Sequence, residues 1–127
     1  MSRPQTVLIV EDSVLNRRLI EKVLESHGYR VIAAENGQAG LETALRDHPD
    51  LILMDVMMPV MNGYDAARQI RMRRELAHVP IVALTASAMP QERERALAAG
   101  CDGYIAKPID TRAFPSQIRQ YCRPAGE

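Results

Sequence analysis

Short apolar runs alternate along the chain with longer stretches in which apolar residues recur every three or four positions. Uninterrupted apolar runs, rather than strict alternation, are typical of strands covered on both faces, as in a parallel sheet. The runs predict strands at residues 7–10, 31–34, 51–54, 81–84 and 104–106. Strand and helix patterns therefore alternate five times, which predicts an α/β fold: a doubly wound, five-stranded parallel sheet with helices on both faces.

The stretches between the runs predict helices with recognisable ends. In the first, Leu15, Leu19, Val23 and Leu24 fall on one stripe, with Ser13 as the N-cap and Gly28 as the stop. The other stripes are Leu41, Ala44 and Leu45 after Asn36; Ala67, Ile70 and the stem of Arg74 after Asn62; a helix from Pro90 to Gly100; and Phe114, Ile118, Tyr121 and Cys122. Pro115 allows two interpretations of the last one: a helix beginning near Phe114 after a loose turn over 110–113, or a kinked helix.

Length and composition limit the class of protein. The 127 residues suit a single domain, 1–127, with short tails at 1–6 and 123–127. Lysine plus arginine balances aspartate plus glutamate at 16 each, so the chain lacks the basic excess of a nucleic-acid binder. No apolar run is long enough for a membrane span or a signal-peptide core, and Cys101 and Cys122 form neither a disulfide framework nor a zinc spacing. We expect a cytoplasmic domain without direct nucleic-acid or membrane contact, and two cysteines that only pack.

A reactive or ion-binding side chain follows four of the predicted strands. Glu11 and Asp12 follow the first, Asp55 the third, Thr85 the fourth and Lys107 the fifth. In an open parallel sheet the carboxyl ends of the strands share one rim, where ligands bind. Random loop starts would rarely deliver three carboxylates, a hydroxyl and an ammonium to that rim.

The chemistry of this set favours phosphoryl transfer. Converging carboxylates repel one another unless a cation neutralises them, and hard oxygen donors favour Mg²⁺, whereas zinc requires histidine or cysteine. The histidines, His27, His48 and His78, lie near predicted helix ends or in loops and are interpreted as solvated. Mg²⁺ leaves coordination positions for phosphoryl oxygens, to which Lys107 and Thr85 would add a charge and a hydroxyl. Asp55 is then the natural nucleophile.

Four segments carry a family resemblance: VLIVED at 7–12, LILMDVMMPVMNG at 51–63, PIVALTA at 80–86 and GCDGYIAKP at 100–108. Through them the chain resembles the receiver domain of two-component response regulators, the CheY-like family. The resemblance implies that Asp55 is phosphorylated, that Glu11, Asp12 and the backbone carbonyl of Met57 join Asp55 in holding Mg²⁺, and that Thr85 and Lys107 contact the phosphoryl group. It is greatest to DivK-type single-domain regulators and hybrid-kinase receivers.

The resemblance also implies partners and a switch. The phosphoryl group would come from a phosphohistidine of a sensor histidine kinase or a histidine phosphotransfer protein, docked near residues 14–18 and Pro108. Thr85 would then move inward, Tyr104 would change rotamer, and residues 91–121 would bind a downstream protein target. The chain would be a monomer or weak dimer. It contains no P-loop for direct use of ATP.

Some residues receive separate interpretations. The resemblance implies that the residues two positions beyond Asp55 and two beyond Thr85 influence the access of water. Neither Met57 nor Ser87 offers a carboxylate or amide to orient an attacking water, so we expect slow self-dephosphorylation relative to receivers with Asn or Glu there. Met54 is expected in the core, whereas Met57, Met58 and Met61 lie by the rim, where core and partner roles are evenly balanced. Arg71, Arg73 and Arg74 are interpreted as a solvated helix end.

Two other functions remain as alternatives to a phosphoryl acceptor that is not a turnover enzyme. An aspartyl-phosphate phosphatase of the haloacid-dehalogenase type also uses a strand-end aspartate and Mg²⁺, but position 57 offers no second carboxylate. A flavodoxin-like FMN carrier would need a hydroxyl-rich phosphate loop after the first strand, where Glu11 and Asp12 would repel the phosphate instead.

Overall fold

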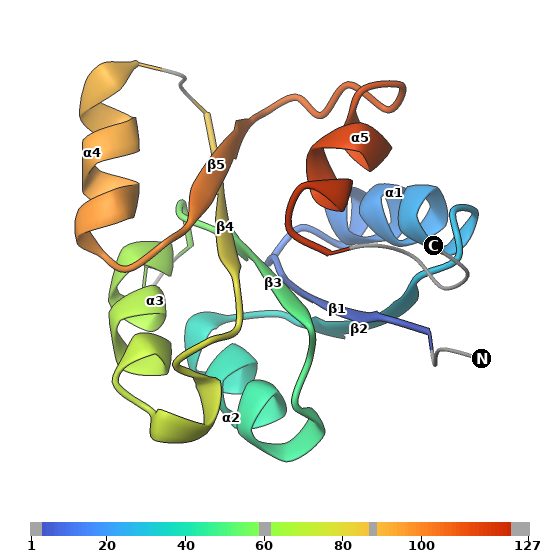
Figure 1. The fold of residues 1–127 in the computed structure, drawn as a ribbon. Coiled ribbons are helices and arrows are strands. Elements are labelled where there is room, and N and C mark those ends of the chain that lie inside the picture. Colours follow the sequence, from blue (N-terminus) through green and yellow to red (C-terminus); the bar gives the residue numbers. More distant parts are fainter. Residues whose placement is uncertain (1–3, 59–61, 87–88, 123–127) are drawn as a thin grey trace.

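Five strands and five α-helices alternate along the chain in the computed structural model, which describes residues 4–58, 62–86 and 89–122 (Figure 1). The elements are β1 (Thr6–Val10), α1 (Val14–Glu25), β2 (Arg30–Ala34), α2 (Gly37–Asp47), β3 (Leu51–Asp55), α3 (Gly63–Arg71), the 3₁₀ helix η1 (Arg74–Leu76), β4 (Ile81–Thr85), α4 (Pro90–Ala98), β5 (Gly103–Ala106) and α5 (Phe114–Arg119).

The strands form one parallel sheet in the order β2-β1-β3-β4-β5. After β1 the chain moves outward to β2 and then returns across β1 to β3, so the strand order reverses between β1 and β3. The loops that leave these two neighbours diverge, which opens a crevice at their carboxyl ends. The predicted fold class is confirmed.

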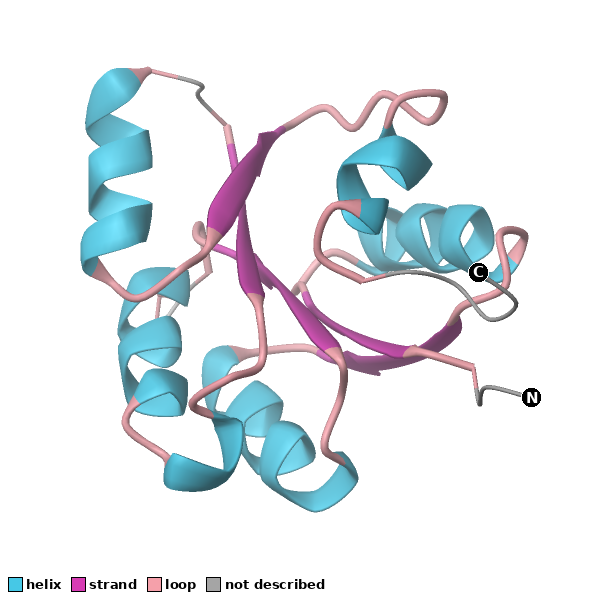
Figure 2. Ribbon diagram, in the orientation of Figure 1, coloured by secondary structure: helices cyan, strands magenta, loops and turns pink. Residues whose placement is uncertain are grey.

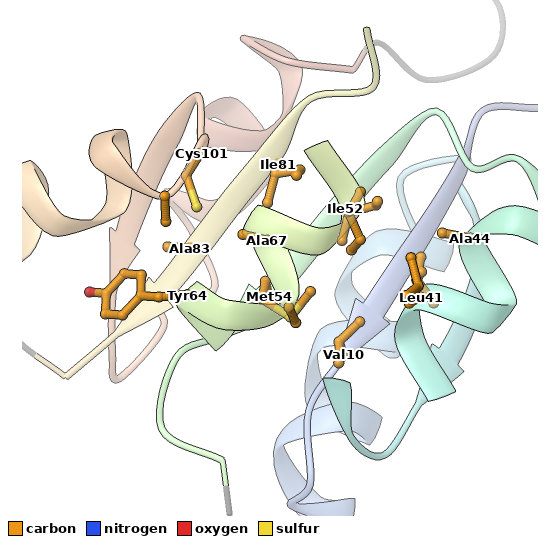
Figure 3. Close-up of a cluster of buried hydrophobic side chains, with 14 of the residues drawn as sticks. Val10, Leu41, Ala44, Ile52, Met54, Tyr64, Ala67, Ile81, Ala83 and Cys101 are labelled. Atoms are coloured by element: carbon orange, nitrogen blue, oxygen red, sulfur yellow. The ribbon is translucent and has the colours of Figure 1, made fainter. Parts of the chain in front are cut away.

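Alternate residues of each strand supply two separate cores, one on each face of the sheet. Ile52 and Met54 face the side covered by α2, α3 and α4, and a close-up of this cluster shows side chains from the sheet and the helices packed together (Figure 3). Leu51 and Leu53 face the opposite side, which α1 and α5 cover. Figure 2 shows the strands in magenta between the two helical layers. Burial on both faces explains why the strands are continuous apolar runs.

Local sequence signals fix the helix starts. Ser13 is the predicted N-cap of α1, and Asn36 and Asn62, where the next two helices were predicted to begin, are N-caps too; all three side chains accept hydrogen bonds from the backbone of the first turn. Pro115 lies in the first turn of α5, where an amide donor is not needed, so the interpretation of a helix that begins near Phe114 is confirmed. None of the described helices has the length and apolar character that crossing a membrane requires.

The predicted apolar face of α1 is partly wrong. Ile20 and Leu24 are the side chains buried against the sheet, whereas Leu15 is 80% and Leu19 43% exposed. Both pairs are spaced four residues apart and lie on neighbouring stripes of the same helix. Hydrophobicity alone could not decide which stripe faces the core.

Two boundaries also differ from the prediction. Thr6 is not part of a tail: it is buried as the first residue of β1, and its amide donates to the Asp50 carboxylate at 2.8 Å. Arg74 does not continue the α3 stripe; it is exposed and begins η1. Pro4 and Gln5 precede β1 without regular secondary structure, and the other predicted tail positions, 1–3 and 123–127, lie outside the described residues.

Arg71 is not a solvated helix end. Its guanidinium donates to the carbonyl oxygens of Gly100 at 2.8 Å, Ala77 at 2.8 Å and Val79 at 3.0 Å, and to the Asp102 carboxylate at 2.9 Å. It therefore joins the end of α3 to the loops before β4 and β5. Hydrogen bonds from a charged donor are stronger than neutral ones, so these contacts are expected to stabilise the packing of α3 against both loops.

We expect Arg71→Ala to lower the free energy of unfolding by about 2–4 kcal/mol, because several acceptors lose their donor together. Arg73→Ala is the matched control, since Arg73 is exposed and carries the same charge; its effect should stay within about 0.5 kcal/mol. Urea unfolding followed by circular dichroism measures both. Equal losses for the two variants would show that Arg71 acts only through its charge.

Candidate functional site

The backbone places the predicted residues at one edge of the sheet. Ladder-type hydrogen bonds continue beyond the strands: the amide of Glu11 donates to Ala34 at 3.0 Å, and that of Lys107 donates to Thr85 at 2.7 Å. Asp55 and Thr85 are the last residues of β3 and β4. The four strand ends therefore deliver their side chains to a common rim from well-supported backbone.

Three carboxylates converge at this rim. Glu11, Asp12 and Asp55 each offer an oxygen, and these oxygens all lie within 4.8 Å of one another. Glu11 and Asp55 are buried, whereas Asp12 is exposed and faces the entrance. The cluster is closed by the protein on one side and accessible from solvent on the other.

Lys107 supplies the positive charge inside the cluster. Its Nζ lies 2.8 Å from Oε1 of Glu11 and 3.2 Å from Oδ1 of Asp55. Burial by itself would lower the pKa of Lys107, but the hydrogen bond to Glu11 and the charges of Asp55 and Glu11 outweigh it and raise that pKa above its ordinary value. Lys107 therefore stays protonated at neutral pH.

The surroundings of Glu11 favour its neutral form, whereas those of Lys107 favour the charged form. Burial, followed by its contact with Asp55, raises the pKa of Glu11 above its ordinary value despite the nearby ammonium of Lys107. Its second oxygen, Oε2, is buried and has no hydrogen-bond partner among the described residues. The described part of the chain thus leaves one buried carboxylate oxygen without a hydrogen bond.

The donor set fits a hard divalent cation. Three carboxylates face one ammonium, which leaves an excess of negative charge, and the unpartnered oxygen of Glu11 belongs to this cluster. Oxygen donors with an open, hydrated side are typical of Mg²⁺ sites. The described residues of the cluster include no histidine or cysteine of the kind that zinc prefers.

The residues after Asp55 divide between site and core. The amide of Met57 donates to Oδ1 of Asp55 at 3.1 Å, while the Met57 side chain is 73% exposed at the entrance. Met54 lies in the core as predicted, and Met58 is buried as well, so Met58 is not part of a surface for partners. Met61 and Ser87 lie outside the described residues, and metal binding by the Met57 carbonyl stays a prediction.

Thr85 and Tyr104 lie on neighbouring strands but differ in surroundings. Thr85 is buried at the end of β4, next to the rim. Tyr104 is half-buried on β5 and packs against the core cluster on the α3 and α4 side, where it lines a hollow with Ala96, Leu97 and Tyr121. The structure therefore brings Thr85 to the rim and places Tyr104 beside α4.

Two residues at the site were not singled out from the sequence. Gly63 packs on the β3 end: a Cβ there would lie 2.2 Å from the Asp55 carbonyl oxygen, so a larger residue would displace α3 from Asp55. Arg17 donates from Nη1 to the Glu11 carbonyl at 2.8 Å. The Asn62-Gly63 pair could have been noticed as a close approach, whereas nothing in the sequence points to the Arg17 contact.

An apolar groove lies beside the rim. It has a volume of about 320 Å³ and is lined by Asn16, Leu19, Ile20, Lys107, Pro108 and Ile109. Lys107 thus belongs to both the carboxylate cluster and the groove, and the exposed Leu15 of α1 extends the apolar surface nearby.

Comparisons with known proteins agree with this geometry. The family model described as response regulator receiver domain matches residues 7–119. The polar-differentiation response regulator DivK of Brucella anthropi is 40% identical over 118 residues, covering 93% of this chain and 96% of that protein. The receiver domain of the sensor histidine kinase PA1611 from Pseudomonas aeruginosa, solved with a magnesium ion in its active-site cleft, is 39% identical with a TM-score of 0.85, covering 94% of this chain and 98% of that one. This chain is also similar to the co-crystal structure of the Saccharomyces cerevisiae histidine phosphotransfer protein Ypd1 with the receiver domain of Ssk1. The match is 35% identical with a TM-score of 0.84 and covers 95% of this chain and 91% of that one.

We expect Glu11→Gln to stabilise the metal-free chain and to weaken Mg²⁺ binding by about tenfold or more. Because the pKa of Glu11 is raised in the folded chain, the unfolded chain loses this proton first as pH rises above 4.5. Stability is therefore lost between that pH and the raised pKa, and a neutral side chain avoids the loss. Thermal unfolding at pH 7, with and without Mg²⁺, measures both effects.

The matched control is Glu94→Gln, since Glu94 is exposed on α4 and undergoes the same charge change. Its Tm and its stabilisation by Mg²⁺ should equal those of the wild type. A Glu11→Gln chain that is less stable than the wild type without metal, or that is stabilised equally by Mg²⁺, would contradict the prediction.

Proposed function

The chain belongs to the response regulator receiver domain family, and from this premise we propose that Asp55 accepts a phosphoryl group from a phosphohistidine and thereby switches a partner-binding surface. The observation that carries the proposal is the convergence of Glu11, Asp12, Asp55 and Lys107 at one rim of the sheet. A buried carboxylate beside an ammonium and two further acids suits acceptance of a phosphoryl group.

The transfer forms one bond and breaks another. A carboxylate oxygen of Asp55 attacks phosphorus, the P–N bond to the donor histidine breaks, and the imidazole nitrogen leaves with the electron pair. The Met57 amide and Lys107 both contact Oδ1 of Asp55 and so hold the carboxylate in a fixed orientation. The product is an acyl phosphate on Asp55.

The remaining site residues stabilise charge on the phosphoryl oxygens. Glu11, Asp12, Asp55 and the Met57 carbonyl are the proposed Mg²⁺ ligands, and bound Mg²⁺ would supply positive charge next to the phosphoryl group. Lys107 is already charged and lies within hydrogen-bond distance of Asp55, so only a short movement is needed to reach a phosphoryl oxygen. Thr85, buried at the neighbouring strand end, is the proposed hydroxyl donor.

The donor is proposed to dock on the surface formed by α1 and the groove beside Pro108. Leu15 and Leu19 are exposed on α1, and the groove that includes Leu19 reaches Lys107. Apolar side chains at a surface next to a reactive site are typical of a protein-binding patch. The complex of the related Ssk1 receiver with the phosphotransfer protein Ypd1 supports a partner of this class.

The proposed output involves Thr85 and Tyr104. A phosphoryl group on Asp55 would draw Thr85 toward the rim, and Tyr104 would move into the space beside β4. Tyr104 lines a hollow with residues of α4, so its rotamer would change the surface formed by residues 91–121, where a downstream protein binds. The two arrangements need differ by only a few kcal/mol for phosphorylation to shift their populations.

Labelling with acetyl phosphate tests the proposal. We expect Asp55 to be labelled only when Mg²⁺ is present, beryllofluoride to protect it, and Asp55→Asn to abolish the label. Asp65→Asn is the control, since Asp65 is exposed on α3, and should be labelled like the wild type. Mass spectrometry of peptides, after borohydride trapping and digestion, locates the site.

Three outcomes would contradict the proposed function. They are a label on another residue, labelling that is independent of Mg²⁺, and continuous release of phosphate from phosphate monoesters. The last would favour a haloacid-dehalogenase-type phosphatase instead. The residue at position 57 argues against such a phosphatase, because Met57 has no carboxylic acid that could protonate a leaving group.

We further expect Met57→Asn to shorten the lifetime of the phosphorylated chain. An amide at the entrance can orient water toward phosphorus, which the thioether cannot, and a gain on the order of tenfold corresponds to about 1.4 kcal/mol. Met57→Leu is the matched control because it keeps an apolar side chain of similar size. Phosphate loss from labelled protein gives the rates, and equal rates for all three chains would exclude this role for position 57.

A further inference from the structure

An arginine outside the carboxylate cluster reaches the backbone of the site. Arg17 is half-buried in α1, and its Nη1 donates to the carbonyl oxygen of Glu11 at 2.8 Å. The backbone amide of Arg17 bonds to Ser13 at 3.0 Å as part of the first helical turn. The guanidinium therefore connects α1 to the chain segment that precedes it.

The carbonyl that Arg17 holds lies between two acidic residues. It belongs to the peptide group that joins Glu11 to Asp12, and a peptide group is planar. On the other side of Glu11, its amide donates to Ala34 of β2 at 3.0 Å. The backbone of Glu11 is thus fixed at both ends, which sets the directions in which the Glu11 and Asp12 side chains leave it.

This backbone restraint matters because the surroundings of Glu11 compensate its buried carboxylate only in part. Its side chain is buried, one oxygen contacts Lys107, and the other has no hydrogen-bond partner among the described residues. The ion pair with Lys107 therefore holds only one of the two oxygens, and the fixed backbone is a second restraint on the direction of the carboxylate. Releasing the Glu11–Asp12 peptide would let both carboxylates turn away from Asp55.

We propose that Arg17 is a positioning residue of the metal site: it fixes the Glu11–Asp12 peptide so that the two carboxylates are arranged for Mg²⁺ in advance. The inference rests on the proposed function, because it takes these carboxylates to be Mg²⁺ ligands. Arg17 itself is not one of the proposed Mg²⁺ ligands or phosphoryl contacts.

The sign of the effect separates positioning from charge. A guanidinium near a cation site repels the cation, so removing its charge alone would strengthen Mg²⁺ binding. Removing a positioning contact instead weakens binding, since part of the binding free energy is then used to order the loop. The two explanations predict changes in opposite directions.

The test compares Arg17→Met with Arg18→Met. Arg18 is the next residue of α1, is exposed and carries the same charge, and methionine keeps the apolar stem and the helix propensity in both variants. Mg²⁺ is titrated into each full chain while the amide resonances of Glu11, Asp12 and Asp55 are followed by NMR. We expect Mg²⁺ to bind Arg17→Met about tenfold more weakly, and to bind Arg18→Met as tightly as the wild type or slightly more tightly.

Labelling by acetyl phosphate provides a second readout. The Mg²⁺ concentration for half-maximal rate should rise in Arg17→Met, whereas the rate at saturating Mg²⁺ should change little, because Asp55 and Lys107 are untouched. A loss of overall fold would instead lower the saturated rate and reduce the dispersion of amide resonances across the whole spectrum. Arg17→Ala, measured in the same way, guards against a defect specific to methionine.

Mg²⁺ binding by the Arg17 variants that equals or exceeds that of Arg18→Met overturns the inference. The proposed function can fail separately: wild-type protein that binds Mg²⁺ without labelling on Asp55 overturns that function, while the Mg²⁺ titrations still decide the role of Arg17.

Discussion

The site depends on one ammonium group that forms ion pairs with two buried carboxylates. Lys107 lies between Glu11 and Asp55, and neither acid has a second basic side chain among its described hydrogen-bond partners. Burying a carboxylate without full compensation costs free energy, and the raised pKa of Glu11 expresses that cost. The protein therefore keeps an unfavourable excess of negative charge at the edge of its sheet, which a cation and then a phosphoryl group can use.

Buried, hydrogen-bonded backbone surrounds this arrangement and holds it in place. The strands β1, β3 and β4 are buried on both faces, and hydrogen bonds continue beyond the strand ends at Glu11, Val56 and Lys107. Gly63 adds a close contact of α3 with the Asp55 carbonyl, and Arg17 adds the tie from α1. Like-charged groups are thus held together by the sheet and by the first turns of two helices, rather than by attraction among themselves.

The sequence predicted the features that arise from local pattern. The buried strands are continuous apolar runs, the helix starts carry Ser13, Asn36 and Asn62, and the site residues occupy strand ends, where topology brings them together. The features that it missed depend on tertiary contacts between residues without a distinguishing pattern. Arg71 resembles Arg73 in the sequence, yet only Arg71 lies where backbone carbonyls from two loops converge.

Leu15 and Leu19 of α1 were predicted to face the core but are exposed, and their position on the surface is informative. A helix that only covers a sheet needs one apolar stripe, and Ile20 and Leu24 provide it. The second stripe, with Leu15 and Leu19, keeps apolar side chains in water beside a groove that ends at Lys107. Exposing such side chains gives no stability to the isolated domain, and their placement beside the groove supports the proposed docking of a partner on α1. Lys107 belongs to both the groove and the carboxylate cluster. A donor bound on α1 would therefore lie next to the ammonium group that is proposed to stabilise the phosphoryl charge.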